Sequence, residues 1–147
     1  METLEEMISR HEGECAVPYD DATGKPLKPG DTLQGYLTLG KGHNCAKPIS
    51  ARAIEVIFMD DLNEAINDVT HAFPWFHDLT TTRQRVIIDM CFNLGLPRLQ
   101  KFVEFLKACE LGDYETAANE ILDSLAAKQA KSRYLELANM MRGSEPV

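Results

Sequence analysis

The chain has 147 residues, of which 44% are hydrophobic and 26% charged, and its net charge is −8. This composition predicts one soluble globular domain, and a chain of this length buries roughly two thirds of its unfolded surface. The acidity argues against general nucleic-acid binding. Membrane insertion and export by a signal peptide are not expected, because neither a span of roughly 20 apolar residues nor a signal-like start is visible.

The four cysteines are Cys15, Cys45, Cys91 and Cys109. They form no CxxC motif, and no histidine stands at zinc-finger spacing from them. We interpret them as reduced thiols that behave as small apolar residues. The sequence therefore predicts neither a disulfide scaffold nor a metal or other cofactor.

The first predicted helix covers residues 4–12. Thr3 and Glu6 form a T-x-x-E capping box at its start, and Gly13 is a stop signal at its end. Apolar positions recur at helical spacing and predict one buried stripe, made of Leu4, Met7, Ile8 and His11. Glu12 lies at the edge of this stripe, so we expect its carboxyl group to be partly shielded from water.

The next segment, residues 22–35, is rich in glycine and proline turn signals. It predicts a β-hairpin that ends in the strand-like run 35–42. In this run two leucines alternate with Tyr36 and Thr38. We therefore expect Thr38 to face away from the apolar side, toward a cleft.

The same part of the chain is locally basic. Between residues 22 and 52 the only acid is Asp31, against five cations, Lys25, Lys28, Lys41, Lys47 and Arg52. Such a segment would attract an anionic polymer, and the alternative is a solvated loop with scattered lysines.

The remaining residues predict helices. Ser50 caps a long helix, which is followed by a loop at 71–80. Thr80 or Thr81 caps a second helix that stops at Gly95, and three more helices are expected near residues 102–112, 114–125 and 135–143. We predict an α+β, mainly α fold in one domain, residues 1–147. It would consist of an N-terminal helix and β lobe to about residue 49, a connecting helix at about 50–72 and a helical lobe from 73, with a cleft between the lobes.

The chemistry of the chain is concentrated near its start. Glu12 precedes Asp21 by nine positions, and Thr38 follows in the strand-like run. Hydrolysis of a glycosidic bond needs a proton donor for the leaving oxygen and a positioned water at the sugar carbon. Two carboxylates with a nearby hydroxyl are suited to that reaction.

Several ordered motifs extend this pattern along nearly the whole chain. They are HEG at 11–13, PYDD at 18–21, GYLTLGKGHN at 35–44, RQRVIIDMCFNLG at 83–95, DYETAAN at 113–119 and SRYLELANMMRG at 132–143. Because these motifs occur in this order, the chain resembles the phage-type lysozymes, or endolysins, of glycoside hydrolase family 24. The resemblance implies a lysozyme-like fold, with residues 83–95 as the central buried helix.

The resemblance also implies roles for individual residues. Glu12 matches the general acid, Asp21 the second carboxylate that orients water, and Thr38 the threonine that helps to hold that water. Phe92 matches an aromatic residue at the mouth of the sugar cleft, and His43 matches a structural histidine that pairs with an acid. Tyr36, beside Thr38, is a further candidate for substrate contact.

The implied substrate is the peptidoglycan glycan strand. The enzyme would be a monomeric muramidase that cuts the β-1,4 bond between N-acetylmuramic acid and N-acetylglucosamine. The resemblance implies inversion at the sugar carbon, whereas the sequence by itself leaves inversion and retention open. Lacking an export signal, a phage enzyme of this kind would stay in the host bacterial cytoplasm until a holin releases it to the cell wall.

Some features depart from the family pattern. Two aspartates are adjacent, and we choose Asp21 because it keeps the spacing from Glu12, which leaves Asp20 as a solvated neighbour. Sixteen residues separate Asp21 from Thr38, more than in the shortest family members. Ala126 stands where a tryptophan is common, and the chain is acidic whereas many cell-wall lysozymes are basic.

Alternative interpretations stay open at this level. Phe92 is equally compatible with the core, and Trp75 is interpreted as a hydrophobic anchor rather than a sugar-stacking residue. The function itself has two alternatives: a catalytically weak, wall-binding or tail-associated lysozyme-like module, and a lytic transglycosylase. Asp21 argues against the transglycosylase, because those enzymes typically work with one catalytic acid.

Overall fold

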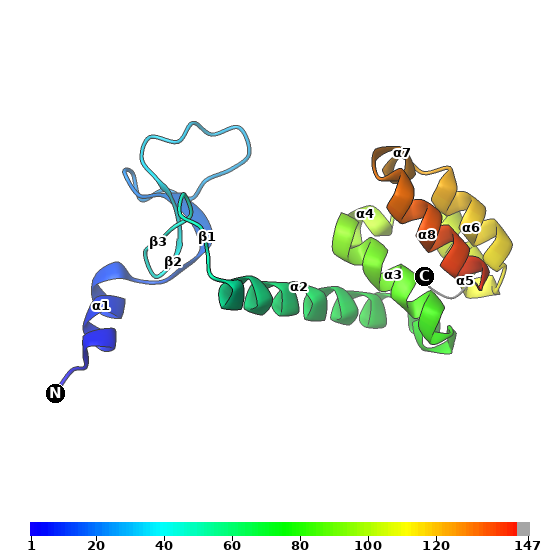
Figure 1. The fold of residues 1–147 in the computed structure, drawn as a ribbon, viewed down its shortest axis with the longest axis horizontal. Helices are drawn as coiled ribbons and strands as arrows, with labels where there is room; N and C mark the ends of the chain where they lie inside the picture. Colours follow the sequence, from blue (N-terminus) through cyan, green and yellow to red (C-terminus); the bar gives the residue numbers. More distant parts are fainter. Residues whose placement is uncertain (144–147) are drawn as a thin grey trace. The chain divides into compact units, whose positions relative to one another are not determined.

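The computed structural model describes residues 1–143, which form two compact units, an N-terminal unit of residues 1–55 and a C-terminal unit from residue 56 onward. The described chain is mainly helical, with one small antiparallel sheet in the N-terminal unit (Figure 1). The predicted α+β, mainly α fold class is therefore confirmed. Two compact units do not by themselves decide how many domains the chain has, so the single-domain assignment stays a prediction.

The N-terminal unit begins with helix α1, Leu4–Glu12. Thr3 and Glu6 form the predicted capping box, in which Thr3 Oγ1 accepts the Glu6 amide at 3.1 Å and a Glu6 carboxylate oxygen accepts the Thr3 amide at 2.8 Å. Gly13 ends the helix with a φ of 70°. The apolar stripe is wrongly predicted as buried, because no residue of α1 is buried.

The sheet contains β1 (Cys15–Asp20), β2 (Leu37–Gly40) and β3 (His43–Asn44), with β2 in the middle. β1 pairs with β2 through Tyr19 opposite Thr38, and β2 pairs with β3 through Thr38 opposite Asn44. β1 is missing from the predicted elements, since Pro18 interrupts it. A proline is tolerated there because β1 is an edge strand of the sheet.

Residues 22–35 form a loop rather than the predicted hairpin arm. The loop is joined to β1 by a bridge between Tyr19 and Pro26 and by a hydrogen bond from the Leu27 amide to the Pro18 carbonyl at 2.9 Å. Asp31 closes a turn inside the loop by accepting the Lys28 amide at 2.8 Å. The loop therefore follows the outer edge of β1 before it returns to the sheet.

Helix α2, Ala51–Ala72, contains the boundary between the two units. Ser50 caps it as predicted, because its hydroxyl accepts the Ala53 amide at 3.1 Å. Only Ala65 and Val69 of this helix are buried.

The C-terminal unit is helical. After α2 it contains η1 (Pro74–Asp78), α3 (Thr81–Leu94), α4 (Leu96–Leu99), α5 (Val103–Leu111), α6 (Tyr114–Leu122), α7 (Leu125–Gln129) and α8 (Lys131–Arg142). The predicted ends at Gly95, Gly112 and Gly143 are correct. The short elements η1, α4 and α7 are not predicted, because each has at most five residues and so little helical periodicity.

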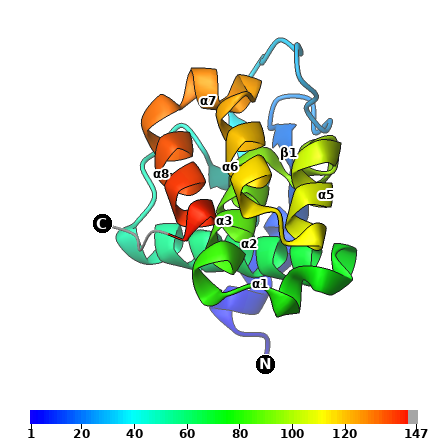
Figure 2. The ribbon, with the colours of Figure 1, turned by 90° about the vertical axis from the view of Figure 1, so that its right-hand side faces the viewer.

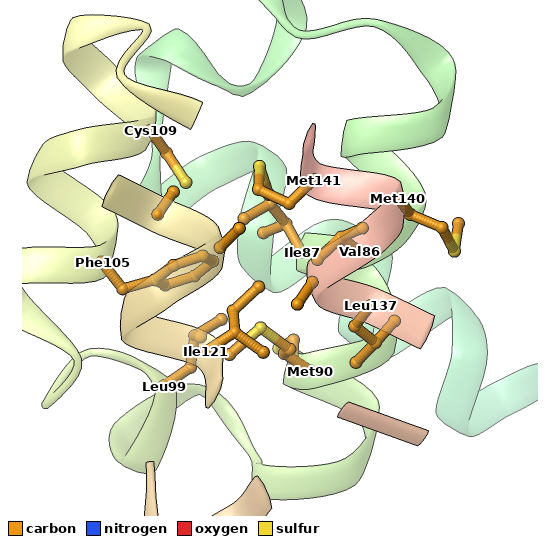
Figure 3. Packing of buried hydrophobic residues seen from close by; sticks show 14 of the residues in the cluster. Val86, Ile87, Met90, Leu99, Phe105, Cys109, Ile121, Leu137, Met140 and Met141 are labelled. Atoms are coloured by element: carbon orange, nitrogen blue, oxygen red, sulfur yellow. The ribbon is translucent and has the colours of Figure 1, made fainter. Parts of the chain in front are cut away.

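The core of this unit forms around α3. Its residues Val86, Ile87 and Met90 are fully buried, and Figure 3 shows them among side chains from α5, α6 and α8, including Phe105, Ile121, Leu137 and Met141. Helices α6 and α8 pack side by side, and α8 packs on α3 (Figure 2). The structure confirms the prediction that residues 83–95 contain a buried central helix.

All four cysteines are free. Burial raises the pKa of Cys91 to about 11 and that of Cys109 to about 12, so both remain protonated thiols at neutral pH. They pack in the core as small apolar residues. None of the helices within residues 1–143 is long and apolar enough to cross a membrane.

Candidate active site

Glu12 is the last residue of α1, and its side chain is exposed. The partial shielding expected from the sequence is therefore wrong for this structure. What the carboxylate does contact is the β2–β3 turn: a Cβ built on Gly42 would stand 2.5 Å from Glu12 Oε2 and 2.9 Å from its Cδ. The turn approaches Glu12 this closely only because residue 42 has no side chain.

Asp21 follows β1 directly and is bound to Tyr36 at the start of the returning chain. Its carboxylate oxygen Oδ1 accepts the Tyr36 amide at 2.7 Å, and its own amide donates to the Tyr36 carbonyl at 3.1 Å. Gly35 packs against the same oxygen, because a Cβ at position 35 would collide with Asp21 Oδ1 and approach Ala22 Cβ to 2.8 Å. The exposed carboxylate of Asp21 is thus held against the backbone of residues 35 and 36.

Thr38 lies in the central strand and is only 5% exposed. Its hydroxyl donates to the Tyr36 carbonyl at 3.0 Å, the same oxygen that accepts the Asp21 amide. The predicted orientation in β2 is wrong, since Thr38 is the buried residue and Leu37 the exposed one.

Asp20 is 3% exposed and is not the solvated neighbour that the sequence suggested. Its carboxylate accepts three amides, from Gln34 at 2.6 Å, Ala22 at 2.9 Å and Gly35 at 2.9 Å. The Gln34 amide holds the pKa of Asp20 below its usual value, and the amides of Ala22 and Gly35 add to this against the opposing effect of burial. The sequence contains no local signal for these bonds, because two of the donors lie 14 and 15 positions away.

Tyr36 and His43 border this group. Tyr36 is 57% exposed; its backbone amide donates to Asp21, and its carbonyl accepts from both the Asp21 amide and the Thr38 hydroxyl. His43 is exposed in β3 opposite Leu39. Within residues 1–143 its ring has no hydrogen bond or ion pair, so the pairing with an acid that the resemblance implies stays a prediction.

Phe92 belongs to the C-terminal unit, where it is 40% exposed on α3. Its ring lies 5.8 Å from that of Phe58 on α2, in a tilted arrangement. Both rings line an apolar groove of about 370 Å³, whose other lining residues are Leu62, Ile66, Arg85, Ile88, Asp89 and Arg133. The Arg133–Asp89 ion pair, at 2.8 Å, stands at this groove and is partly exposed.

Residues 1–143 contain no group of three or more His, Cys, Asp or Glu side chains that could hold a metal ion. The candidate groups of the N-terminal unit are the carboxylates of Glu12 and Asp21, the Thr38 hydroxyl and the backbone that holds them. Such a set can donate a proton and position a water molecule.

The phage lysozyme family matches residues 9–137, which is most of the chain. The chain belongs to the phage lysozyme family. No curated protein sequence matches it.

For a phage lysozyme the general activity is that of a glycoside hydrolase acting on peptidoglycan, a muramidase or endolysin role. The matched range includes Glu12, Asp21, Thr38 and Phe92. The residues that sequence reasoning missed are Asp20, Gly35 and Gly42. Gly35 was visible only as a turn signal, and Gly42 only as a residue that permits close backbone approach or tight turning. Their contacts with Asp21 and Glu12 depend on how the chain folds back on itself.

Proposed function

We propose that this phage lysozyme is an endolysin that hydrolyses the β-1,4 bond between N-acetylmuramic acid and N-acetylglucosamine, with Glu12 as general acid and Asp21 and Thr38 as the groups that position water. The observation that carries the proposal is the shared contact at Tyr36. The Asp21 carboxylate, the Asp21 amide and the Thr38 hydroxyl all bond to the backbone of this one residue, at 2.7, 3.1 and 3.0 Å.

In the proposed reaction, Glu12 in its protonated form gives a proton to the glycosidic oxygen as the bond breaks. Asp21 stays ionised, stabilises the oxocarbenium-like transition state, and with Thr38 places a water on the opposite face of the sugar ring. Attack from that face inverts the anomeric carbon. Tyr36 and Phe92 contact the glycan strand, and no cofactor takes part.

The contact of Gly42 with Glu12 supports the same assignment. It brings the β2–β3 turn against the proposed acid, and Thr38 lies on β2 just before that turn. The proposed acid, on α1, is thereby in contact with the small sheet that contains Thr38. This contact restrains their relative geometry, which general acid catalysis requires.

The deciding experiment is product analysis on purified peptidoglycan. We expect muropeptides with a free reducing end, whose masses show that one water has been added for each bond cleaved. NMR spectra taken during the reaction should show the inverted anomer. Anhydro-muramyl products would instead establish a lytic transglycosylase. Binding to the polymer without any turnover would establish the wall-binding module.

Glu12→Gln tests the acid. This variant should lose clearing of permeabilised Gram-negative cells while its circular dichroism spectrum stays that of the wild type. The matched control is Glu14→Gln, which neutralises an exposed carboxylate two positions further on and should clear normally. Clearing by Glu12→Gln at the wild-type rate would refute the assignment of the acid.

We further propose that the enzyme acts as a monomer and waits in the host cytoplasm until a holin opens the membrane. Expressed in a Gram-negative host, it should leave cell density unchanged until a pore-forming holin is co-expressed. Lysis without a pore former would refute this route. Light scattering of the purified enzyme should give the mass of one chain.

A further inference from the structure

The loop of residues 22–35 is closed at both ends by one residue, Asp20. The backbone carbonyl of Asp20 accepts the Gly24 amide at 2.7 Å, and its amide donates to the Lys25 carbonyl at 3.1 Å. Its carboxylate accepts the amides of Gln34 and Gly35 at the far end of the loop. Asp20 therefore determines where the chain re-enters the sheet.

The re-entry point is also where Asp21 is held. Three successive amides, those of Gln34, Gly35 and Tyr36, donate to the carboxylates of two successive residues, Asp20 and Asp21. The first two bind Asp20 and the third binds Asp21. The peptide unit that joins Gly35 to Tyr36 is planar, so a movement of residues 34 and 35 also moves the Tyr36 amide that donates to Asp21.

Gly35 is a second link between the carboxylates of Asp20 and Asp21. Its amide binds Asp20 Oδ1 at 2.9 Å, while its α-carbon faces Asp21 so closely that a Cβ would collide with Asp21 Oδ1. Its φ lies outside the left-handed region, so the close approach rather than backbone strain is what requires glycine. Residue 35 is thus hydrogen-bonded to Asp20 and also packed against Asp21.

We propose that Asp20 is a positioning residue for the reaction: by binding the amides of Gln34 and Gly35, it packs residues 34–36 against Asp21 and fixes the direction of that carboxylate. Asp20 acts through the backbone and does not touch the substrate. The inference rests on the proposed function of Asp21. Its geometric part, the coupling of the two carboxylates through three amides, is measurable without catalysis.

Three short bonds to a buried carboxylate make this a firm attachment. Bonds from amides to an ionised carboxylate are about twice as strong as neutral ones, and the lowered pKa of Asp20 keeps it ionised at working pH. An asparagine has a single acceptor oxygen, and its NH₂ group would face an amide donor. Asp20→Asn therefore releases at least one of the three amides while changing the side-chain volume little.

The first test is kinetic. With purified peptidoglycan, we expect Asp20→Asn to lower kcat roughly 10- to 100-fold, the size of effect that a misplaced catalytic group produces, with KM nearly unchanged. Asp21→Asn in the same assay should be inactive. If Asp21→Asn keeps full activity, the proposed function of Asp21 fails, whereas an inactive Asp21→Asn beside a fully active Asp20→Asn overturns the positioning role.

The second test is spectroscopic and needs no substrate. Amide protons bonded to carboxylates resonate downfield in ¹H–¹⁵N spectra, so the Gln34, Gly35 and Tyr36 signals report the three bonds. In Asp20→Asn the Tyr36 signal should move upfield, although its acceptor, Asp21, is unchanged. A Tyr36 signal that stays fixed while Gln34 or Gly35 moves would show that Asp20 does not position Asp21.

Gly35→Ala keeps the proposal testable if Asp20→Asn does not fold. This variant retains the amide that binds Asp20 but pushes a methyl group into Asp21, and its kcat should fall by the same roughly 10- to 100-fold. The control is Gly30→Ala in the same loop: its φ of 92° strains an alanine, but a Cβ there meets nothing within 4 Å, so this variant separates backbone strain in the loop from the contact with Asp21. Equal kcat values for the two alanine variants would overturn the inference.

Discussion

In the N-terminal unit the only buried residues are Asp20 and Thr38, both polar, whereas every buried apolar residue within the described chain lies in the C-terminal unit. The first unit is held by hydrogen bonds from backbone amides to carboxylates and between short strands. The second is held by side chains from α3, α5, α6 and α8 that pack on one another. The proposed catalytic carboxylates thus lie in the unit without an apolar core.

This difference has a consequence for how each unit responds to change. Apolar packing depends on volume, is insensitive to pH and fails when a large side chain is removed. A carboxylate that binds amides depends on charge and direction, and a single atom in the wrong place disturbs it. Four substitutions or conditions test the contrast, from the largest expected effect to the smallest.

The largest effect is expected from the core of the C-terminal unit. Phe105 on α5 is 1% exposed, and Phe105→Ala should lower the free energy of unfolding by about 3–5 kcal/mol. Leu111 on the same helix is 73% exposed, so Leu111→Ala should change it by less than about 0.5 kcal/mol. Urea denaturation of both variants checks this, and equal losses would contradict the assignment of the core.

Next in size is the effect of the turn that packs on Glu12. Gly42 and Gly40 both have positive φ, 73° and 67°, so alanine at either site costs roughly 1–2 kcal/mol of backbone strain. Only at residue 42 would the added Cβ meet Glu12. We expect similar falls in Tm but a loss of kcat of at least about tenfold in Gly42→Ala alone. Equal kcat values would show that this contact does not matter for activity.

A smaller effect should appear in acid. Because the folded-state pKa of Asp20 is lowered, its ionised form contributes stability that is complete above the unfolded value near 3.8 and is lost as pH falls through the folded value. The hydrogen-exchange protection factors of Gln34 and Gly35, taken relative to the intrinsic rate at each pH, should therefore fall below about pH 3.8 in the wild type. Asp20→Asn should lack this fall in protection. An identical pH dependence in both proteins would assign it to another group.

The smallest effect is expected at the start of α1. Thr3→Ala removes one half of the capping box and should cost about 1 kcal/mol of helix stability. Because no side chain of α1 is buried, the loss should be confined to faster exchange of the first-turn amides. Thr3→Ser restores the acceptor and should restore slow exchange. A large fall in Tm would indicate that α1 is held by more than its cap.

What the sequence determined is mostly local. The capping box of α1, the cap Ser50 and the stop at Gly112 were predicted correctly, because each signal acts within about one helical turn of itself. For α3 the sequence left Thr80 and Thr81 open, and the structure shows Thr80 as the cap. The central buried helix that the resemblance implied at residues 83–95 was also correct, and its buried residues Val86, Ile87, Met90 and Cys91 recur at helical spacing. The ordered motifs then indicated the lysozyme family, which the match over residues 9–137 establishes.

Only the tertiary structure decided which of two adjacent aspartates is buried. Asp20 and Asp21 have the same chemistry and the same turn propensity, and their partners arrive from 14 and 15 positions further along the chain. The burial of Thr38 in place of Leu37 and the contacts of Gly35 and Gly42 were decided in the same way. A hydrogen bond that closes a long loop leaves no periodic pattern in the sequence. The arrangement of this site is therefore visible only in the folded chain.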